Sequence, residues 1–286
     1  MRIDLHAHST ASDGTDTPAE LVRAAGAAGL DVLALTDHDT TGGWAEAVEA
    51  LPPGLTLVRG AELSCVSLAG PRRVTLHLLA YLFDPADPAF VAERRRLRES
   101  RLDRGRRIVE LLAADGYPVD WPQVRALAGG GAVGRPHVAR ALMRAGVVST
   151  VDEAFGRLLH PGSPYYVSKA DTEVLTAVRM VRAAGGVPVF AHPLARHRGR
   201  VVPDGVIAAM AEAGLAGLEV DHPDQEPADR AHLRGLAGDL GLFVTGSSDY
   251  HGVNKVVRLG QESTSAAAYE RLVEQPIALA PITRPR

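Results

Sequence analysis

Nine histidine and carboxylate side chains stand at or just after the ends of short apolar runs of the kind that form β-strands. They are His6, His8, Asp13, His38, Glu62, His77, His192, Asp249 and His251. Imidazoles mixed with carboxylates, without sulfur, suit Mn²⁺, Fe²⁺ or Zn²⁺, whereas Mg²⁺ sites prefer oxygen ligands. So many candidate ligands indicate a site for two to three ions rather than one.

The spacing of these residues favours one shared site. His6 and His8 are two apart after the first apolar run, so the period-2 geometry of a strand sends both side chains to the same face. Such a pair also arises by chance, but the same placement recurs after later runs. In parallel α/β sheets the loops at the carboxyl ends of the strands converge on the ligand site. We therefore expect all nine residues at that edge of a sheet.

A cluster of two or three ions points to one class of reaction. Ions about 3.5–4 Å apart hold a bridging hydroxide, neutralise phosphate oxygens and stabilise the leaving oxygen of an in-line displacement. The pattern therefore predicts a phosphoester hydrolase in which a metal-bound hydroxide is the nucleophile.

Short apolar runs alternate with Ala-rich amphipathic segments along much of the chain. Strands are predicted over 2–5, 32–36, 55–63, 187–191, 217–220 and 242–245, and helices over 18–28, 43–49, 173–184, 204–213 and 227–240. Gly29, Gly185 and Gly214 follow three of these helices at the position where glycine ends a helix. Repeated βα units imply a parallel sheet, closed or nearly closed, with a last short strand after Pro276.

Between residues 93 and 166 consecutive helical patterns replace this alternation. Residues 1–92 and 167–286 are therefore predicted to form a catalytic barrel, and 93–166 a helical insertion that caps the substrate. Gly129-Gly130-Gly131 divides the insertion and predicts a mobile loop. Eight arginines lie between Arg94 and Arg107, an excess that genomic base composition explains as readily as a functional stripe.

Composition narrows the class of protein. Hydrophobic residues make up 46% of the 286 and aromatics only 5%, which fits a sheet flanked by Ala-rich helices. A formal net charge of −3 gives no global attraction to duplex DNA or to an anionic membrane. The single cysteine, Cys65, excludes an internal disulfide, and no segment has the pattern of a signal peptide or a membrane span. We expect a cytoplasmic protein.

The motifs around the nine residues resemble those of the PHP (polymerase and histidinol phosphatase) superfamily of metal-dependent phosphoesterases. They are His6-Ala7-His8-Ser9 with Asp13, Thr36-Asp37-His38-Asp39, Glu62, His77, Ala191-His192-Pro193 and Ser248-Asp249-Tyr250-His251. The resemblance covers nearly the whole chain. It implies an α/β fold, a distorted (β/α)₇ barrel, with a centre of three metal ions.

The resemblance also implies how the ligands are shared. One ion would lie between His6, His8, Glu62 and Asp249, a second between Asp13, His38 and His192, and a third between Glu62, His77 and His251, with Glu62 as the bridge. Family members often have histidine where this chain has Asp13, and a carboxylate there favours Mn²⁺ over Fe²⁺ or Zn²⁺. Asp37 and Asp39 are predicted to accept hydrogen bonds from ligand imidazoles.

Within the superfamily the chain looks most like the bacterial 3′,5′-nucleoside bisphosphate phosphatases and 5′-to-3′ exoribonucleases. The pointers are the helical insertion, Gly134-Arg135-Pro136-His137 at a helix start, and Glu219-Val220-Asp221-His222-Pro223 after a strand. Arg135 and His137 are expected to bind phosphate, because free N–H groups at a helix N-terminus favour an anion. His222 is expected to contact the substrate or protonate the leaving group. Arg196 and Arg198 are further candidates for phosphate binding.

Three functions stay open on the sequence. The leading one is release of phosphate or mononucleotides from a nucleotide or short RNA. The second is a phosphatase for a small metabolite such as histidinol phosphate, and the third is a metal-binding module that regulates without turnover. Processing of long RNA ranks below hydrolysis of bisphosphates and dinucleotides, because it requires a basic groove with stacking side chains. The Arg94 to Arg107 stripe and the pair Tyr165-Tyr166 are weak candidates for such a groove.

Overall fold

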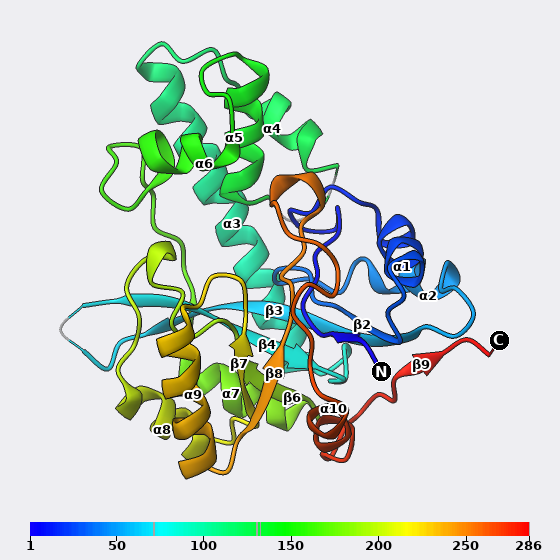
Figure 1. The fold of residues 1–286 in the computed structure, drawn as a ribbon. Helices are drawn as coiled ribbons and strands as arrows, with labels where there is room; N and C mark the ends of the chain where they lie inside the picture. The colour runs from blue at the N-terminus through cyan, green and yellow to red at the C-terminus, as the bar shows by residue number, and fades with distance from the viewer. Residues whose placement is uncertain (71, 130, 132, 286) are drawn as a thin grey trace.

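A nearly closed sheet forms the larger lobe of the molecule, and a helical lobe stands over one of its edges (Figure 1). The computed structural model describes residues 1–70, 72–129, 131 and 133–285. Seven strands follow one another around the sheet in the order β1-β2-β3-β4-β6-β7-β8. Their bounds are β1 Ile3–Asp4, β2 Val32–Leu35, β3 Thr56–Ser67, β4 Val74–Tyr81, β6 Val187–Phe190, β7 Gly217–Asp221 and β8 Phe243–Gly246. The α/β barrel predicted from the sequence is thereby confirmed.

The two ends of the sheet approach each other just beyond β1 and β8. A parallel bridge joins Ala7 to Tyr250, and the amide of His8 donates to the carbonyl of Tyr250 over 2.9 Å. Two short strands, β5 (Thr172–Glu173) and β9 (Ile282–Thr283), pair with β3 outside the main path. The predicted strand after Pro276 is therefore confirmed as β9.

The sequence did not predict strand β4, which runs antiparallel to both β3 and β6, so the prediction of a parallel sheet is wrong there. β3 also continues to Ser67, four residues beyond its predicted end. Glu62 therefore lies inside β3, and His77 lies inside β4 opposite Ser64. Because β4 is reversed, the half of it that carries His77 lies at the edge where the parallel strands end, so this residue still reaches the common rim.

Helices cover the outside of the sheet at positions close to those predicted. They are α1 Pro18–Ala27, α2 Trp44–Glu49, α7 Val174–Ala183, α8 Asp204–Glu212, α9 Pro227–Asp239 and α10 Ala266–Val273. The sequence did not predict α10. Thr17 and Glu20 form a capping box that fixes the start of α1. Gly29, Gly185 and Gly214 have positive φ angles of 73°, 66° and 109°, as expected of glycines that end helices.

The alternation of side chains along each strand divides the barrel core into two parts. Leu33, Leu35 and Leu57 pack with buried residues of α1, α2, α7, α8 and α9 on the outer face. Ile3, Val32 and Val189 belong to a separate cluster, to which only α10 contributes a buried helical residue. Aliphatic packing on both faces makes the strands stiff supports for the polar residues at the rim.

The helical lobe, here called the cap, has a core of its own. Its elements are α3 Pro88–Ala114, α4 Trp121–Leu127, α5 Arg135–Arg144, α6 Val151–Ala154 and the π-helix η1 Phe155–Leu159. α3 begins five residues before position 93, and it links the lobes because Phe90 packs in the barrel core and Ile108 in the cap core. Of the loop predicted at Gly129-Gly130-Gly131, Gly130 lies outside the described residues.

Two short 3₁₀ helices, η2 (Arg196–Arg198) and η3 (Gly252–Asn254), lie in the loops after β6 and β8. None of the helices within the described ranges combines the length and the apolar character that crossing a membrane requires.

Candidate metal centre

The first group of candidate ligands joins the two ends of the barrel. The Nε2 atoms of His6 and His8, which follow β1, lie 3.1 Å apart. Glu62 Oε2 is 3.3 and 3.2 Å from these two nitrogens, and Asp249 Oδ1 is 3.4 Å from each. All four side chains are buried. Four donor atoms therefore converge on one point, as the family resemblance implied.

A second group lies beside His8 at the same rim. His8, Asp13, His38 and His251 offer ligand atoms that all lie within 4.8 Å of one another. Asp13 Oδ2 is 3.7 Å from His38 Nε2, and Asp13 Oδ1 is 3.4 Å from His251 Nε2. The expectation that His192 completes this group is wrong, because His251 occupies the place.

The third group gathers around the other oxygen of Glu62. Glu62 Oε1 is 2.7 Å from His77 Nδ1 and 3.2 Å from His192 Nε2, while Oε2 is 3.0 Å from His38 Nδ1. His192 therefore stands where His251 was expected. Glu62 faces the first group with one oxygen and the third with the other, which is the geometry of a bridging ligand.

Backbone conformation explains the exchange of His192 and His251. Four non-glycine residues in the described part of the chain have positive φ, and three lie here: Asp39 at 54°, His192 at 32° and Asp249 at 53°. Residues other than glycine rarely adopt positive φ angles, and backbone strain of this kind is found mainly at functional sites. A left-handed residue redirects its own side chain and the chain after it, so strand alternation no longer predicts which way either histidine points.

Several donor atoms of these groups are not satisfied by hydrogen bonds to one another, whereas divalent cations could bind them. Among the described residues, Asp13 Oδ1, His38 Nδ1 and His77 Nδ1 are buried and have no partner in hydrogen-bonding geometry. Buried polar atoms are nearly always satisfied, so unpartnered atoms that face carboxylates and imidazoles fit a site for cations. The mixture of nitrogen and oxygen donors suits Mn²⁺, Fe²⁺ or Zn²⁺.

The imidazoles of the cluster fall into two kinds, those whose pKa is lowered and those whose pKa is raised. Burial, with Arg198 nearby, lowers the pKa of His192 to about 3, and burial with Lys255 lowers that of His251 to about 4. Burial opposes the charge of His8 too, but hydrogen bonds to Asp249 and Glu62 raise its pKa to about 9. His192 and His251 are therefore neutral near pH 7, the state in which an imidazole can bind a metal.

The orienting role of Glu219 on β7 was not predicted, although the motif quoted after that strand begins with this residue. Its Oε1 is 3.0 Å from Nδ1 of His6, and its Oε2 accepts the backbone N–H of His192 over 2.9 Å. Burial would raise its pKa, yet the charge of His6 brings it down to about 2. Glu219 thus fixes the position of one ligand ring and one ligand backbone. Its place in the middle of an apolar strand was the available signal.

The orienting role predicted for Asp37 and Asp39 is wrong, because neither accepts a hydrogen bond from an imidazole within the described residues. Asp37 accepts the amide and the hydroxyl of Ser9 over 2.8 and 2.7 Å. Asp39 accepts the amide and hydroxyl of Ser64 over 2.7 and 2.8 Å and also pairs with Arg101. Both carboxylates therefore fix the rim loops rather than the ligand rings.

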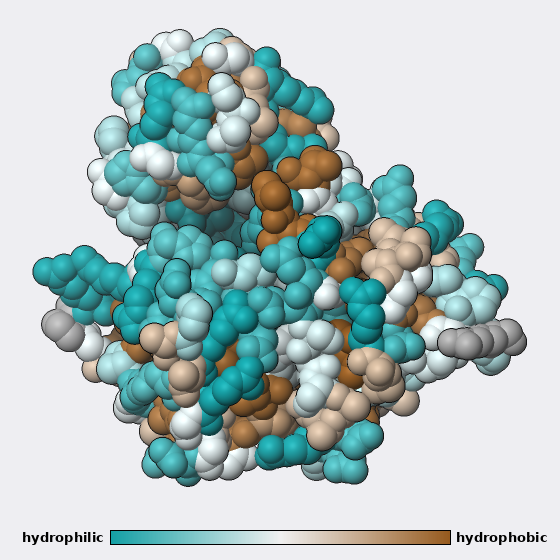
Figure 2. Space-filling view, viewed as in Figure 1, coloured by the Kyte–Doolittle hydropathy of each residue, from teal (hydrophilic) through white to brown (hydrophobic). Residues whose placement is uncertain are grey.

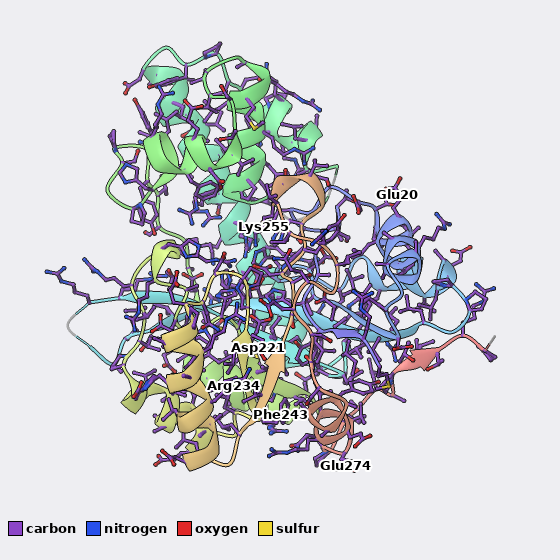
Figure 3. All side chains as sticks on the ribbon, viewed as in Figure 1. Glu20, Asp221, Arg234, Phe243, Lys255 and Glu274 are labelled. Carbon is purple, nitrogen blue, oxygen red and sulfur yellow. The ribbon has the colours of Figure 1, made fainter. Side chains whose placement is uncertain are left out.

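Three further side chains surround the outer oxygen of Asp249. Arg198 Nη2 lies 2.7 Å from Asp249 Oδ2, Lys255 Nζ 2.5 Å and His222 Nε2 3.3 Å. Figure 3 labels Lys255 where the cap meets the barrel. Sequence reasoning missed Lys255, although it is one of only two lysines in the chain and follows the Asp249 motif closely.

Arg135 and His137, which were also predicted to bind phosphate, are held by contacts within the cap. Arg135 donates to the carbonyl of Leu159 over 2.8 Å, and its guanidinium lies 5.0 Å from the ring centre of Phe155. His137 is buried, and its Nδ1 accepts the amide of Gly134 over 3.0 Å.

Arg196 is exposed and pairs with Asp229, away from the ligands. Most of the arginine stripe on α3 is also solvated, but Arg94, Arg101 and Arg104 are buried.

Comparison with known proteins identifies the family. Residues 4–100 match the model of the PHP domain. A 3′,5′-nucleoside bisphosphate phosphatase of Chromobacterium violaceum is 37% identical over 260 residues, which are 87% of this chain and 87% of that protein. This chain belongs to the PHP family.

Two further matches support the same family. A 5′-3′ exoribonuclease of Haemophilus influenzae is 35% identical over 252 residues, covering 87% of the chain and 90% of that protein. A crystal structure from Bifidobacterium adolescentis, assigned as a metal-dependent phosphoesterase, superposes with a TM-score of 0.89 at 36% identity and covers 95% of each chain. The family resemblance read from the motifs is thus confirmed.

Proposed function

We propose that this PHP protein is a metal-dependent phosphoesterase that hydrolyses nucleotide phosphates, with 3′,5′-nucleoside bisphosphates and short 5′-phosphorylated RNA as its substrates. The observation that carries the proposal is the set of three ligand groups that share Glu62 at the open rim beneath the cap. Two relatives, named as a bisphosphate phosphatase and an exoribonuclease, support the substrate class.

The nine ligands would hold two to three divalent ions, and Mn²⁺ fits them best because Asp13 places a hard carboxylate in the second group. When bound, such ions supply Lewis acidity, charge neutralisation and an activated water. His6, His8 and Asp249 would fix one ion relative to the others through the shared carboxylate of Glu62.

Around Asp249, the chain's own cations would bind the scissile phosphate. Arg198 presents a guanidinium and Lys255 an ammonium within 2.7 Å of one carboxylate oxygen. Because Asp249 also faces His6 and His8, oxygens of a phosphate at this point would contact both cations. Arginine and lysine together would then orient the ester for in-line attack.

His222 would act as the proton donor to the leaving oxygen. Its Nδ1 accepts the backbone N–H of Asp224 over 3.0 Å, so in the neutral ring the proton sits on Nε2. That nitrogen points at Asp249 and hence toward the ions and the substrate. A donor held by its other nitrogen keeps its direction during turnover.

The cap would close over the nucleotide. Its predicted extent, residues 93–166, contains Arg135 and His137 at the start of α5, which we assign to the part of the substrate beyond the scissile phosphate. Figure 2 shows a recess between the cap and the barrel, and a nucleotide would enter there.

The proposal is tested by purifying the protein, measuring its bound metals, and removing them with a chelator. Mn²⁺, Fe²⁺ and Zn²⁺ are then restored one at a time. Phosphate and nucleotide release are timed from adenosine 3′,5′-bisphosphate, AMP and a 5′-phosphorylated short RNA. We expect turnover to vanish on chelation and to return best with Mn²⁺.

Two outcomes would replace the proposal. A strong preference for histidinol phosphate over every nucleotide would make the protein a small-metabolite phosphatase. Stoichiometric metal binding without release of phosphate from any substrate would make it a regulatory module.

A further inference from the structure

The loop that follows β8 presents an apolar surface to solvent beside the metal centre. Val253 is 91% exposed and Val256 is fully exposed. The loop, orange in Figure 1, rises toward the cap, and Figure 2 shows hydrophobic surface over the same place. One exposed valine needs no explanation, but two in one loop beside a catalytic site point to contact with a ligand.

This loop is tied to residues of the metal centre. Asn254 Nδ2 donates to the backbone carbonyl of Asp13 over 2.8 Å. Lys255, which lies between the two valines, donates from Nζ to Asp249 Oδ2 over 2.5 Å. Asp13 and Asp249 are candidate metal ligands, so both valines have a set position relative to the centre.

A groove of about 940 Å³ lies between this loop and the start of the chain. Its walls include Arg2, Tyr250, Val253, Lys255, Val256 and Arg258. The volume is within the range of sites that bind small ligands. Because Lys255 lines the groove and also contacts Asp249, the groove is continuous with the metal centre.

The walls of the groove carry positive charge. Arg2, Lys255 and Arg258 line it, and there is no Asp or Glu among the described residues of its walls. The guanidinium of Arg2 donates to the carbonyl of Ala28, and a Cβ placed on Gly260 would lie 3.0 Å from its Nη2. In the part of the chain that the structure describes, neither Arg2 nor Arg258 has an ion-pair partner. An anionic ligand would meet no competing carboxylate along these walls.

Apolar surface and one aromatic ring accompany these cations. Tyr250 lines the groove, and its hydroxyl donates to Asp16 over 2.9 Å, which fixes the ring. Val253 and Val256 stand on either side of Lys255. Single-stranded nucleic acid is bound by this combination, because cations follow its backbone and flat apolar surfaces pack on its bases.

The tyrosine pair that the sequence indicated for such a groove is engaged within the cap. Tyr165 donates its hydroxyl to Asp115 over 2.7 Å, and its ring packs edge-on against Tyr117 with 5.6 Å between the ring centres. The ring centre of Tyr166 lies 5.9 Å from the guanidinium of Arg135. The loop after β8 is therefore the better candidate.

We propose that this groove binds the nucleotides that follow the scissile ester of a short RNA and packs their bases on Tyr250, Val253 and Val256. The inference rests on the proposed function and specifies where the rest of its substrate lies. Lys255 stands where the groove meets the metal centre, so a strand whose ester lies at the ions would pass directly into the groove. Packing on base faces tolerates any sequence, as an enzyme that shortens RNA step by step requires.

The groove is long enough for more than one nucleotide. Arg2 in its wall precedes β1, and His6 at the metal centre follows β1, so about 13 Å of extended chain separates the two. Nucleotides rise ~3.4 Å each along a stacked strand, which gives room for about two to four of them. A longer RNA therefore makes contacts that a nucleoside bisphosphate or a dinucleotide lacks.

The decisive experiment compares 5′-phosphorylated RNAs of two and six nucleotides. The kcat/KM of the wild type should be higher for the hexamer, and a hexamer without bases after the scissile ester should lose this advantage. In the double variant Val253→Ser, Val256→Ser the ratio of hexamer to dimer should fall at least about fivefold. Val91→Ser, an exposed valine at the start of α3, is the matched control and should keep the wild-type ratio.

Salt dependence tests the cations separately. The Kd of the metal-loaded protein for a phosphorothioate hexamer, which resists hydrolysis, is measured at increasing salt. Loss of one phosphate contact in Arg258→Gln should reduce the slope of log Kd against log salt by about 0.7. Arg179→Gln is the control, because Arg179 is exposed on α7 and does not line the groove. Its slope should equal that of the wild type.

The outcomes separate the groove from the proposed function. Hydrolysis of the bisphosphate with equal kcat/KM for both RNAs, or with an unchanged ratio in the valine variant, would overturn the groove and leave the phosphoesterase intact. Self-association of the wild type that the valine variant abolishes, with an unchanged ratio, would assign the surface to a second copy of the chain. Tighter binding of the hexamer by the wild type than by the valine variant, without turnover of any nucleotide, would overturn the proposed function and keep the groove.

Discussion

The barrel rim and helix α3 at the base of the cap bury charged side chains in opposite ways. At the rim, imidazoles and carboxylates lie within 4 Å of one another, and Glu62 alone approaches five histidines. In the cap, Arg104 is buried with no acceptor among the described residues. The rim thus gathers donors of both signs that can satisfy one another or a cation, whereas Arg104 keeps its charge without a partner.

The largest effect should come from the residue that joins the ligand groups. Glu62→Ala removes oxygens shared by the first and third groups, so we expect kcat/KM for adenosine 3′,5′-bisphosphate to fall at least about a thousandfold. Bound metal, measured in parallel, should fall by at least one ion. Glu212→Ala, an exposed carboxylate at the end of α8, is the control. Activity of Glu62→Ala near that of the wild type would contradict the bridged centre.

The next effect concerns the rim residue assigned to proton donation. His222→Ala should lower kcat for the nucleotide about a hundredfold or more. The loss should be much smaller with p-nitrophenyl phosphate, because its leaving group needs no proton. His232→Ala, an exposed histidine on α9, should behave as the wild type. Full turnover of the nucleotide by His222→Ala would remove the role.

A smaller effect should follow when the ligands lose an orienting hydrogen bond and none of them is removed. Glu219→Gln weakens the contacts to His6 Nδ1 and the His192 amide, so we expect a 10- to 100-fold loss of metal affinity or activity. Raising the Mn²⁺ concentration should restore most of the turnover, which a damaged fold would not allow. Glu226→Gln, exposed before α9, serves as the control. An unchanged Mn²⁺ dependence would show that Glu219 does not position the ligands.

The smallest effect tests, through pH, the charge of the buried side chain of Lys169. Burial and Arg101 lower the pKa of Lys169 to about 8 from 10.5, while Asp39 and Asp171 oppose this shift and Arg104 adds to it. Between these values the unfolded chain binds the proton and the folded chain does not, so stability rises with pH. The free energy of unfolding should increase by about 2 kcal/mol from pH 8 to 10.5.

Lys169→Met should flatten this part of the stability curve, as measured by denaturant unfolding at each pH. Because Arg104 titrates in the same direction, the comparison is the difference between the two proteins. Identical slopes would show that Lys169 is not held in a cationic surrounding.

At the rim, residue type and position along the strands carry most of the information. The family resemblance predicted that His6, Glu62 and Asp249 share one ion, and the structure places Glu62 and Asp249 3.3 and 3.4 Å from His6 Nε2. The grouping carried over from the resemblance differs for His192 and His251, which exchange places. Left-handed backbone at His192 and Asp249 helps to set where these side chains point, and short-range periodicity holds no information about such turns.

The cap was harder to predict for a physical reason. Eight arginines between Arg94 and Arg107 look equivalent in sequence, and only helix packing separates buried Arg104 from exposed Arg95. The reversed direction of β4 was hidden too, because an apolar run does not state which way its strand runs. Pairings between distant segments decide both features.

The bridge between Ala7 and Tyr250 has a consequence for biosynthesis. The first ligand group takes His6 and His8 from the start of the chain and Asp249 from near its end. All residues from His6 to Asp249 must therefore leave the ribosome before these side chains can meet. Long-range closure of this kind delays folding. In a nascent chain the donor atoms stay apart until the segment that follows β8 docks against the segment that follows β1.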